Sequence, residues 1–184
     1  DYQLDAVKRM KIGCILCGGV GSGKSRTSLA FYYTLFDGQV NTEQYVRMTE
    51  PPDLYIITTA RKRDTGEWDE ELAHFYMSTD KEHDIYEHTV VVDSWNNIGK
   101  YVGIKNAFFI FDEQRVVGKG TWVKAFLKIT QSNEWILLSA PAIAGRIIFR
   151  YSLQMDFTAT GQTSIISMWF IANSAQSTRR STDI

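Results

Sequence analysis

The chain has 184 residues, of which 44% are hydrophobic and 22% charged, and its formal net charge is −1. This composition excludes a disordered tail and favours one domain with a buried core, because two full domains need a longer chain. No run approaches the ~20 apolar residues of a membrane span and no signal-peptide pattern is present, so we expect a cytoplasmic protein. The near-neutral charge means that contact with nucleic acid would depend on local basic clusters.

Short apolar runs bounded by turn residues predict buried strands of a parallel sheet, because none alternates as a half-exposed strand does. They cover residues 12–17, 54–58, 89–92, 107–111 and 135–138. Between them, three sets of apolar residues recur at helical spacing and predict helices that face the core. The sets are Leu29, Tyr32, Tyr33 and Phe36; Trp68, Leu72, Phe75 and Tyr76; and Trp122, Ala125, Phe126 and Ile129. This alternation predicts a doubly wound α/β domain that ends near residue 140.

The two cysteines, Cys14 and Cys17, lie within the first predicted strand. Residues three apart in a strand point to opposite faces, which argues against a shared metal or a disulfide. We therefore expect two buried thiols.

Residues 18–25 read Gly-Gly-Val-Gly-Ser-Gly-Lys-Ser, the full pattern of a phosphate-binding loop, between the first strand and the first helix. The glycines let backbone N–H groups turn toward phosphates, and the following helix points the positive end of its dipole at them. Lys24 is expected to reach the β- and γ-phosphates of ATP, and Ser25 to ligate Mg²⁺. The predicted nucleotide-binding residues of this segment are Gly18, Gly19, Val20, Gly21, Ser22, Gly23, Lys24, Ser25 and Arg26.

The acidic pair Asp112 and Glu113 directly follows the apolar run 107–111. An acidic residue at the carboxyl end of a parallel strand lies at the edge of the sheet where ligands bind. We expect Asp112 to hold Mg²⁺ through water, and Glu113 to orient and deprotonate the attacking water. The predicted catalytic residues are therefore Lys24, Asp112 and Glu113.

Other segments complete a set of motifs in order. Tyr2 and Gln3 lie upstream of the phosphate loop, residues 58–64 read Thr-Thr-Ala-Arg-Lys-Arg-Asp, and residues 93–98 read Asp-Ser-Trp-Asn-Asn-Ile. Residues 112–115 read Asp-Glu-Gln-Arg, and residues 137–140 read Leu-Leu-Ser-Ala.

This ordered set resembles the Snf-type, DEAD-like helicases of superfamily 2 that phages encode, over about residues 1–140. The resemblance implies a RecA-like P-loop NTPase domain with a mostly parallel sheet flanked by helices. It also implies that Gln3 reads adenine, with Tyr2 packed against the ring, and that the segments 58–64 and 93–98 correspond to motifs Ia and Ib. In that family Asp-Glu-x-Asp or Asp-Glu-x-His is usual at motif II, so Arg115 is an uncommon fourth letter.

The remaining segment, 141–184, departs from the family. Motif III usually reads Ser-Ala-Thr-Pro, but Ala140 runs straight into Pro141. Only weak similarities to motifs V and VI follow, at Thr158-Ala159 and in residues 176–180. A second RecA-like domain needs roughly 100 residues or more. We therefore divide the chain into a RecA-like domain, 1–140, and an incomplete C-terminal segment, 141–184, interpreted as a remnant of a second domain.

The cluster Arg61, Lys62 and Arg63 follows a strand at the loop edge of the sheet, where this fold binds nucleic-acid backbone. Three cations there could contact phosphates, and the alternative is a solvated run of charge. Lys119, Lys124 and Lys128 are expected on the polar side of a helix, and the three histidines lack ligand-like spacing.

Three functions remain open. The leading hypothesis is an ATP-dependent DNA helicase or translocase, an ATP hydrolase located in the host cytoplasm if phage-encoded, with ATP and Mg²⁺ as cofactors. DNA is expected rather than RNA, and the motor needs a second RecA-like domain that this chain lacks or holds incomplete. The alternatives are a terminase- or AAA-type P-loop ATPase, and a nucleotide-binding module with little turnover.

Overall fold

The computed structural model describes residues 2–112, 120–140 and 168–170. Its strands are β1 (Ile15–Cys17), β2 (Leu54–Thr58), β3 (Val90–Ser94), β4 (Phe108–Phe111), β5 (Glu134–Ser139) and β6 (Met168–Phe170). They form one sheet in the order β3-β2-β4-β5-β1-β6, and every neighbouring pair is parallel. The predicted parallel α/β sheet is therefore confirmed.

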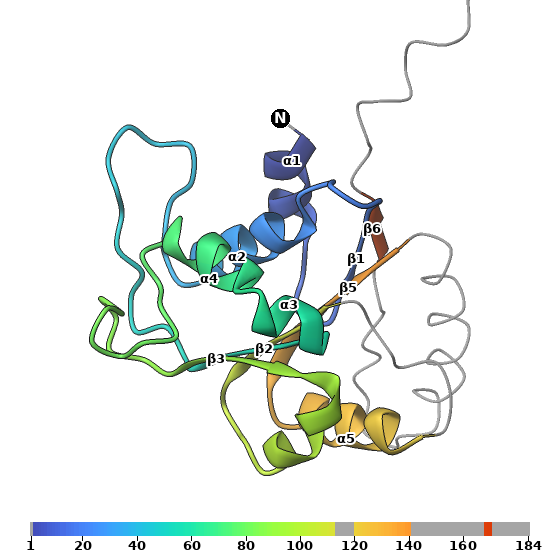
Figure 1. Cartoon of the computed structure of the whole chain (residues 1–184). Coiled ribbons are helices and arrows are strands. Elements are labelled where there is room, and N and C mark those ends of the chain that lie inside the picture. Colours follow the sequence, from blue (N-terminus) through green and yellow to red (C-terminus); the bar gives the residue numbers. More distant parts are fainter. Residues whose placement is uncertain (1, 113–119, 141–167, 171–184) are drawn as a thin grey trace, which may run out of the picture.

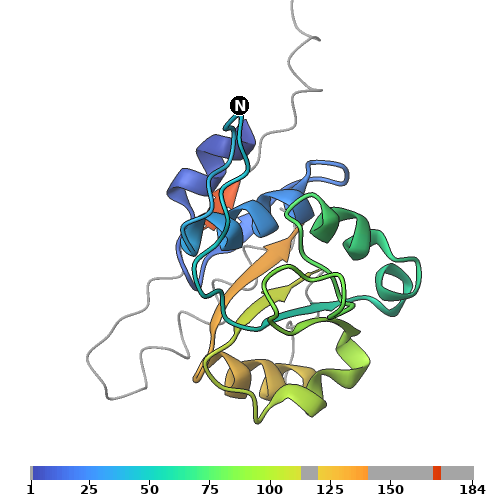
Figure 2. The same ribbon diagram turned by 90° about the vertical axis from the view of Figure 1, so that its left-hand side faces the viewer.

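Helices cover both faces of this sheet. They are α1 (Tyr2–Arg9), α2 (Lys24–Leu35), α3 (Ala60–Asp64), α4 (Glu67–Ala73) and α5 (Thr121–Thr130), with a 3₁₀ helix, η1, at Trp95–Tyr101. Figures 1 and 2 show α2 on one side of the sheet and α5 on the other. The α1 helix packs beside α2, and η1 packs beside α5.

The two faces bury separate apolar clusters. Cys14 and Leu16 of the β1 region belong to the cluster under α1, α2 and α4, whereas Ile15 and Cys17 belong to the cluster under η1 and α5. The two cysteines therefore lie on opposite faces, as predicted, and both are free thiols. Burial raises the pKa of each thiol to about 11, so both stay protonated at neutral pH.

The first predicted strand is too long. It begins at Ile15 rather than at residue 12, because Gly13 has a φ of 79°, in the left-handed region, and breaks the extended backbone. Ile12, on the far side of this break, is exposed.

The apolar stripe predicted around Trp68 is also shorter than expected. Trp68, Leu72 and Phe75 are buried, but α4 ends at Ala73 and Tyr76 is 53% exposed. Tyr76 has a φ of 58°, so the helical spacing no longer determines where its ring points.

The strand β6 lies within the segment 141–184, which the sequence analysis interpreted as a remnant of a second domain, and it pairs with β1 at the edge of the sheet. The domain boundary at residue 140 stays a prediction. Thr158, Ala159 and residues 176–180, with their weak similarity to later motifs, lie outside the described residues.

Candidate nucleotide site

The predicted phosphate loop and Asp112 lie at the carboxyl edge of the sheet. The phosphate loop follows β1, Asp112 follows β4, and β5 lies between those two strands. The amide of Gly18 donates to the carbonyl of Ser139, at the end of β5, with an N–O distance of 3.2 Å. Adjacent strands are about 4.8 Å apart, so the loop and Asp112 are separated by about 10 Å, a gap that phosphates and a hydrated cation can bridge.

The loop has the backbone that a phosphate cradle needs. Gly21 and Gly23 both have a φ of 74°, and Gly23 caps the amino end of α2. The Lys24 ammonium lies over the loop and donates to the carbonyls of Gly18, at 2.8 Å, and Gly19, at 2.7 Å. The hydroxyl of Ser22 is buried and has no hydrogen-bond partner among the described residues.

The helix α1 brings Gln3 against this loop. The side-chain amide of Gln3 donates to the carbonyl of Gly23 at 3.5 Å, and a Cβ on Gly23 would lie 2.0 Å from the Gln3 Nε2. The structure therefore joins the predicted adenine reader to the phosphate loop through a contact that only glycine permits. Tyr2, at the start of the same helix, is exposed.

Arg26, in the first turn of α2, has protein partners. Its Nε donates to a Glu71 carboxylate oxygen at 2.9 Å, and its Nη2 donates to the Nε2 of His74 at 2.7 Å. These contacts join α2 to the α4 region. Val20, at the tip of the loop, is fully exposed.

Asp112 is held by hydrogen bonds of both its side chain and its main chain. Its carboxylate is buried, and its Oδ2 accepts hydrogen bonds from the Thr58 hydroxyl at 2.9 Å and from the Lys62 ammonium at 3.0 Å. Its amide donates to the carbonyl of Ile57, and its carbonyl accepts from the indole N–H of Trp95 at 2.8 Å. The segments that resemble motifs Ia and Ib therefore both contact Asp112, in the segment that resembles motif II.

Thr58 and Trp95 were not predicted as site residues. Both lie in segments that resemble helicase motifs, but of these segments only Arg61, Lys62 and Arg63 were given a predicted role. The sequence feature that could have identified Thr58 is its position, since it is a polar residue at the end of a buried strand that neighbours β4.

The three cations of α3 point in different directions. Arg61 is exposed, Lys62 pairs with Asp112, and Arg63 donates to Asp93 at 3.1 Å and to Asp64 at 2.8 Å. Thr59 caps this short helix by accepting from the Lys62 amide. The predicted nucleic-acid role of all three stays a prediction.

Asp93, at the end of β3, is held by a network of donors. Burial acts to raise the pKa of Asp93, but hydrogen bonds from Tyr101, Asn97, the Ser94 amide and Arg63 outweigh it and lower the pKa to about 2. The carboxylate is therefore ionised at any physiological pH and fixes η1 and α3 to the same strand end.

The residues present fit a nucleotide with Mg²⁺. The amino end of α2, the left-handed glycines, the Lys24 ammonium and the unpartnered Ser22 hydroxyl form a donor set suited to phosphate oxygens. Ser25, which is half-buried, and Asp112 are oxygen ligands of the kind that Mg²⁺ prefers. Glu113, the predicted base, and its neighbours Gln114 and Arg115 lie outside the described residues.

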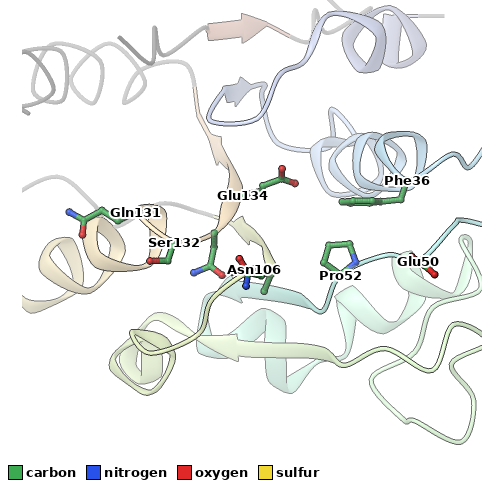
Figure 3. Close-up of a pocket in the computed structure, with 9 residues that line it drawn as sticks. Phe36, Glu50, Pro52, Asn106, Gln131, Ser132 and Glu134 are labelled. Carbon is green, nitrogen blue, oxygen red and sulfur yellow. Dashed lines mark hydrogen bonds between the residues drawn. The ribbon is translucent and has the colours of Figure 1, made fainter. Parts of the chain in front are cut away.

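A separate hollow lies at the opposite edge of the sheet. Its volume is about 610 Å³. It lies beside the residues at which β4 and β5 begin and beside Pro52, which precedes β2. Phe36, Pro52, Asn106 and Glu134 line it (Figure 3). None of the predicted site residues contributes to it, so it plays no part in the chemistry derived from the phosphate loop.

Comparison with solved structures identifies the fold. The SWI2/SNF2 ATPase core of Sulfolobus solfataricus, solved with double-stranded DNA, matches with a TM-score of 0.53 and 14% identity, over 76% of this chain and 31% of that chain. The ATPase domain of the Thermus phage P74-26 large terminase matches with a TM-score of 0.50 and 12% identity, over 92% of this chain and 79% of that one. The chain has a RecA-like ATPase fold.

This chain spans about a third of the SWI2/SNF2 core that it matches. No protein-family model matches the sequence, and no curated protein does. Within the described residues, no helix is long and apolar enough to cross a bilayer, and no group of histidine, cysteine and acidic side chains could hold a metal by itself.

Proposed function

We propose that this chain is the ATP-binding domain of a nucleic-acid-dependent ATPase, a helicase or translocase motor. The observation that carries the proposal is the convergence on Asp112. A phosphate loop alone is common to many NTPases, whereas here Thr58, Lys62 and Trp95, from the two segments that resemble helicase motifs Ia and Ib, all contact the acidic residue expected to hold Mg²⁺. Such contacts provide a physical route between the proposed nucleic-acid site and the proposed Mg²⁺ site.

In this proposal the chain's own groups divide the work. The Lys24 ammonium moves from the loop carbonyls to the β- and γ-phosphates, and the loop amides bind the phosphate oxygens. Ser25 and Asp112 hold Mg²⁺, which neutralises developing charge when bound. Glu113 takes the proton of the attacking water. Gln3 reads adenine, Tyr2 packs on the ring, and Arg26 supports the first turn of α2 next to the phosphates.

The motor cycle requires a second RecA-like domain, in this polypeptide or in another. Closure of two such domains brings arginines to the transferring phosphate, and these can contribute about 10³- to 10⁵-fold in rate. We therefore propose that residues 1–184 by themselves bind Mg-ATP and turn it over slowly.

A terminase-type ATPase is the second candidate. The observation in its favour is coverage, since the terminase ATPase domain aligns over 79% of its own length, against 31% for the SWI2/SNF2 core. The third candidate, a nucleotide-binding module, shares the loop but lacks turnover.

The experiment compares ATP turnover by residues 1–184 with and without DNA, and then tests strand displacement by these residues together with the second RecA-like domain that the motor requires. Turnover that DNA stimulates supports a motor, and displacement of an annealed strand selects the helicase. Stimulation by duplex DNA without displacement favours a translocase or terminase-type motor. Tight Mg-ATP binding with negligible turnover under every condition would contradict the motor and support the module.

A further inference from the structure

The ion pair between Lys62 and Asp112 joins two residues for which the sequence predicts different functions. Lys62 belongs to the basic cluster predicted for nucleic acid, and Asp112 to the predicted Mg²⁺ site. Their Nζ and Oδ2 atoms are 3.0 Å apart, with the Asp112 side chain 2% exposed and the Lys62 side chain 23% exposed. The ammonium therefore reaches into the site from a surface helix.

A buried carboxylate needs a cation or several donors, because removal from water penalises its charge. Asp112 has one neutral donor, Thr58, and one cationic donor, Lys62, on the same oxygen. Mg²⁺ held by Asp112 would provide the same neutralisation with twice the charge. Two cations close to one carboxylate repel each other, so Mg²⁺ and the Lys62 ammonium compete for it.

We propose that Lys62 is an exchangeable counter-ion, which neutralises Asp112 in the metal-free state and leaves it when Mg-nucleotide binds. This inference rests on the proposed nucleotide site. Because Lys62 lies on α3 between Arg61 and Arg63, its departure from Asp112 loosens an ion pair that attaches α3 to a strand end, while the pair between Arg63 and Asp93 persists.

The exchange would couple the two ligands of the protein. A Lys62 ammonium that has left Asp112 could contact nucleic-acid phosphates beside the exposed Arg61, and coupling is reciprocal. A polyanion that attracts Lys62 should therefore favour Mg²⁺ at Asp112, and Mg-nucleotide should favour the polyanion.

The test is the affinity of a fluorescent, non-hydrolysable ATP analogue in EDTA and in Mg²⁺, without nucleic acid. The ratio of the two dissociation constants measures how much Mg²⁺ strengthens nucleotide binding. In Lys62→Met this ratio should rise about tenfold, within the usual range of coupling between sites, because Mg²⁺ no longer displaces a cation. Lys124→Met is the control, since it removes an exposed charge from α5, and its ratio should stay within about twofold of the wild type.

A ratio in Lys62→Met that is unchanged or smaller than in the wild type would overturn the inference and leave Lys62 with a structural role. If Lys62→Met does not fold, Lys62→Gln, which retains a donor without charge, is measured instead with the same expectation. Failure of the proposed nucleotide site looks different, because the wild-type protein would then bind no analogue in either condition.

Thermal melting provides a second readout that does not depend on turnover. In EDTA, Lys62→Met should melt below the wild type because its buried carboxylate has lost the cation. Addition of Mg²⁺ with the analogue should raise the melting temperature of Lys62→Met by more than that of the wild type. Equal increases in the two proteins would contradict the exchange.

Discussion

The indole N–H of Trp95 donates to the main-chain carbonyl of Asp112, and both residues are buried. Removing the donor in Trp95→Phe leaves that carbonyl unsatisfied, which costs about 1–3 kcal/mol in the free energy of unfolding, in addition to lost packing. Chemical denaturation measures this cost. Trp122→Phe is the control, because Trp122 packs against Trp95 but is only partly buried. Equal losses in the two variants would show that the hydrogen bond to Asp112 contributes nothing.

Two glycines of the phosphate loop offer a matched pair of substitutions. Gly21 and Gly23 have the same φ of 74°, so alanine at either position carries the same left-handed strain, about 1–2 kcal/mol. A Cβ at Gly21 meets nothing within 4 Å, whereas at Gly23 it meets the Gln3 amide at 2.0 Å.

We expect Gly23→Ala to be less stable than Gly21→Ala, and Gln3→Ala to remove most of the difference when combined with Gly23→Ala. Denaturation of the single and double variants forms a double-mutant cycle that isolates the contact. Equal stabilities of the two alanine variants would mean that Gln3 does not pack on the loop.

Asp93 makes a specific contribution to acid stability. Its pKa is lowered from 3.8 to about 2 in the folded protein, so the network stabilises the fold above the unfolded value and loses this contribution as the pH falls through about 2. The free-energy difference between the wild type and Asp93→Asn should narrow by about 1–2 kcal/mol between pH 4 and pH 2, because one pKa unit corresponds to about 1.4 kcal/mol.

Urea denaturation across this pH range measures the narrowing. Asp64→Asn is the control, since Asp64 accepts from the same Arg63 but is exposed, and exposed pairs contribute little. A difference for Asp93→Asn that stays constant with pH would contradict the role of the network.

Base discrimination tests the assignment of Gln3. Its side-chain amide can donate to and accept from the edge of adenine, a pairing that guanine reverses. We expect the wild-type protein to prefer ATP over GTP by about 1–3 kcal/mol, and Gln3→Ala to reduce that preference. Competition binding measures both values. Equal affinities of the wild type for the two nucleotides would remove the adenine-reading role.

The strands were predictable because continuous apolar runs are buried. The position of Asp112 was predictable because parallel strands end at one edge of the sheet. The hydrogen-bond and ion-pair partners of the site residues were not predictable. In a helix of 3.6 residues per turn, successive side chains diverge by about 100°, so Arg61, Lys62 and Arg63 cannot share one surface. Recognising residues 60–64 as helical, from the cap at Thr59, would have shown that the cluster divides. The exposure of the Tyr76 ring could not be predicted, since nothing in its helical spacing signals a left-handed backbone.

The most direct test of the account is calorimetric titration of this chain and of Lys24→Ala with Mg-ATP. The wild type should bind, and Lys24→Ala should lose detectable binding, because the Lys24 ammonium is the cation of the loop and its contact with phosphate is charge-assisted. Lys124→Ala removes an exposed cation from α5 and should bind as the wild type does. Near-equal affinities of the wild type and Lys24→Ala would contradict the assignment of the phosphate loop and, with it, the proposed ATPase.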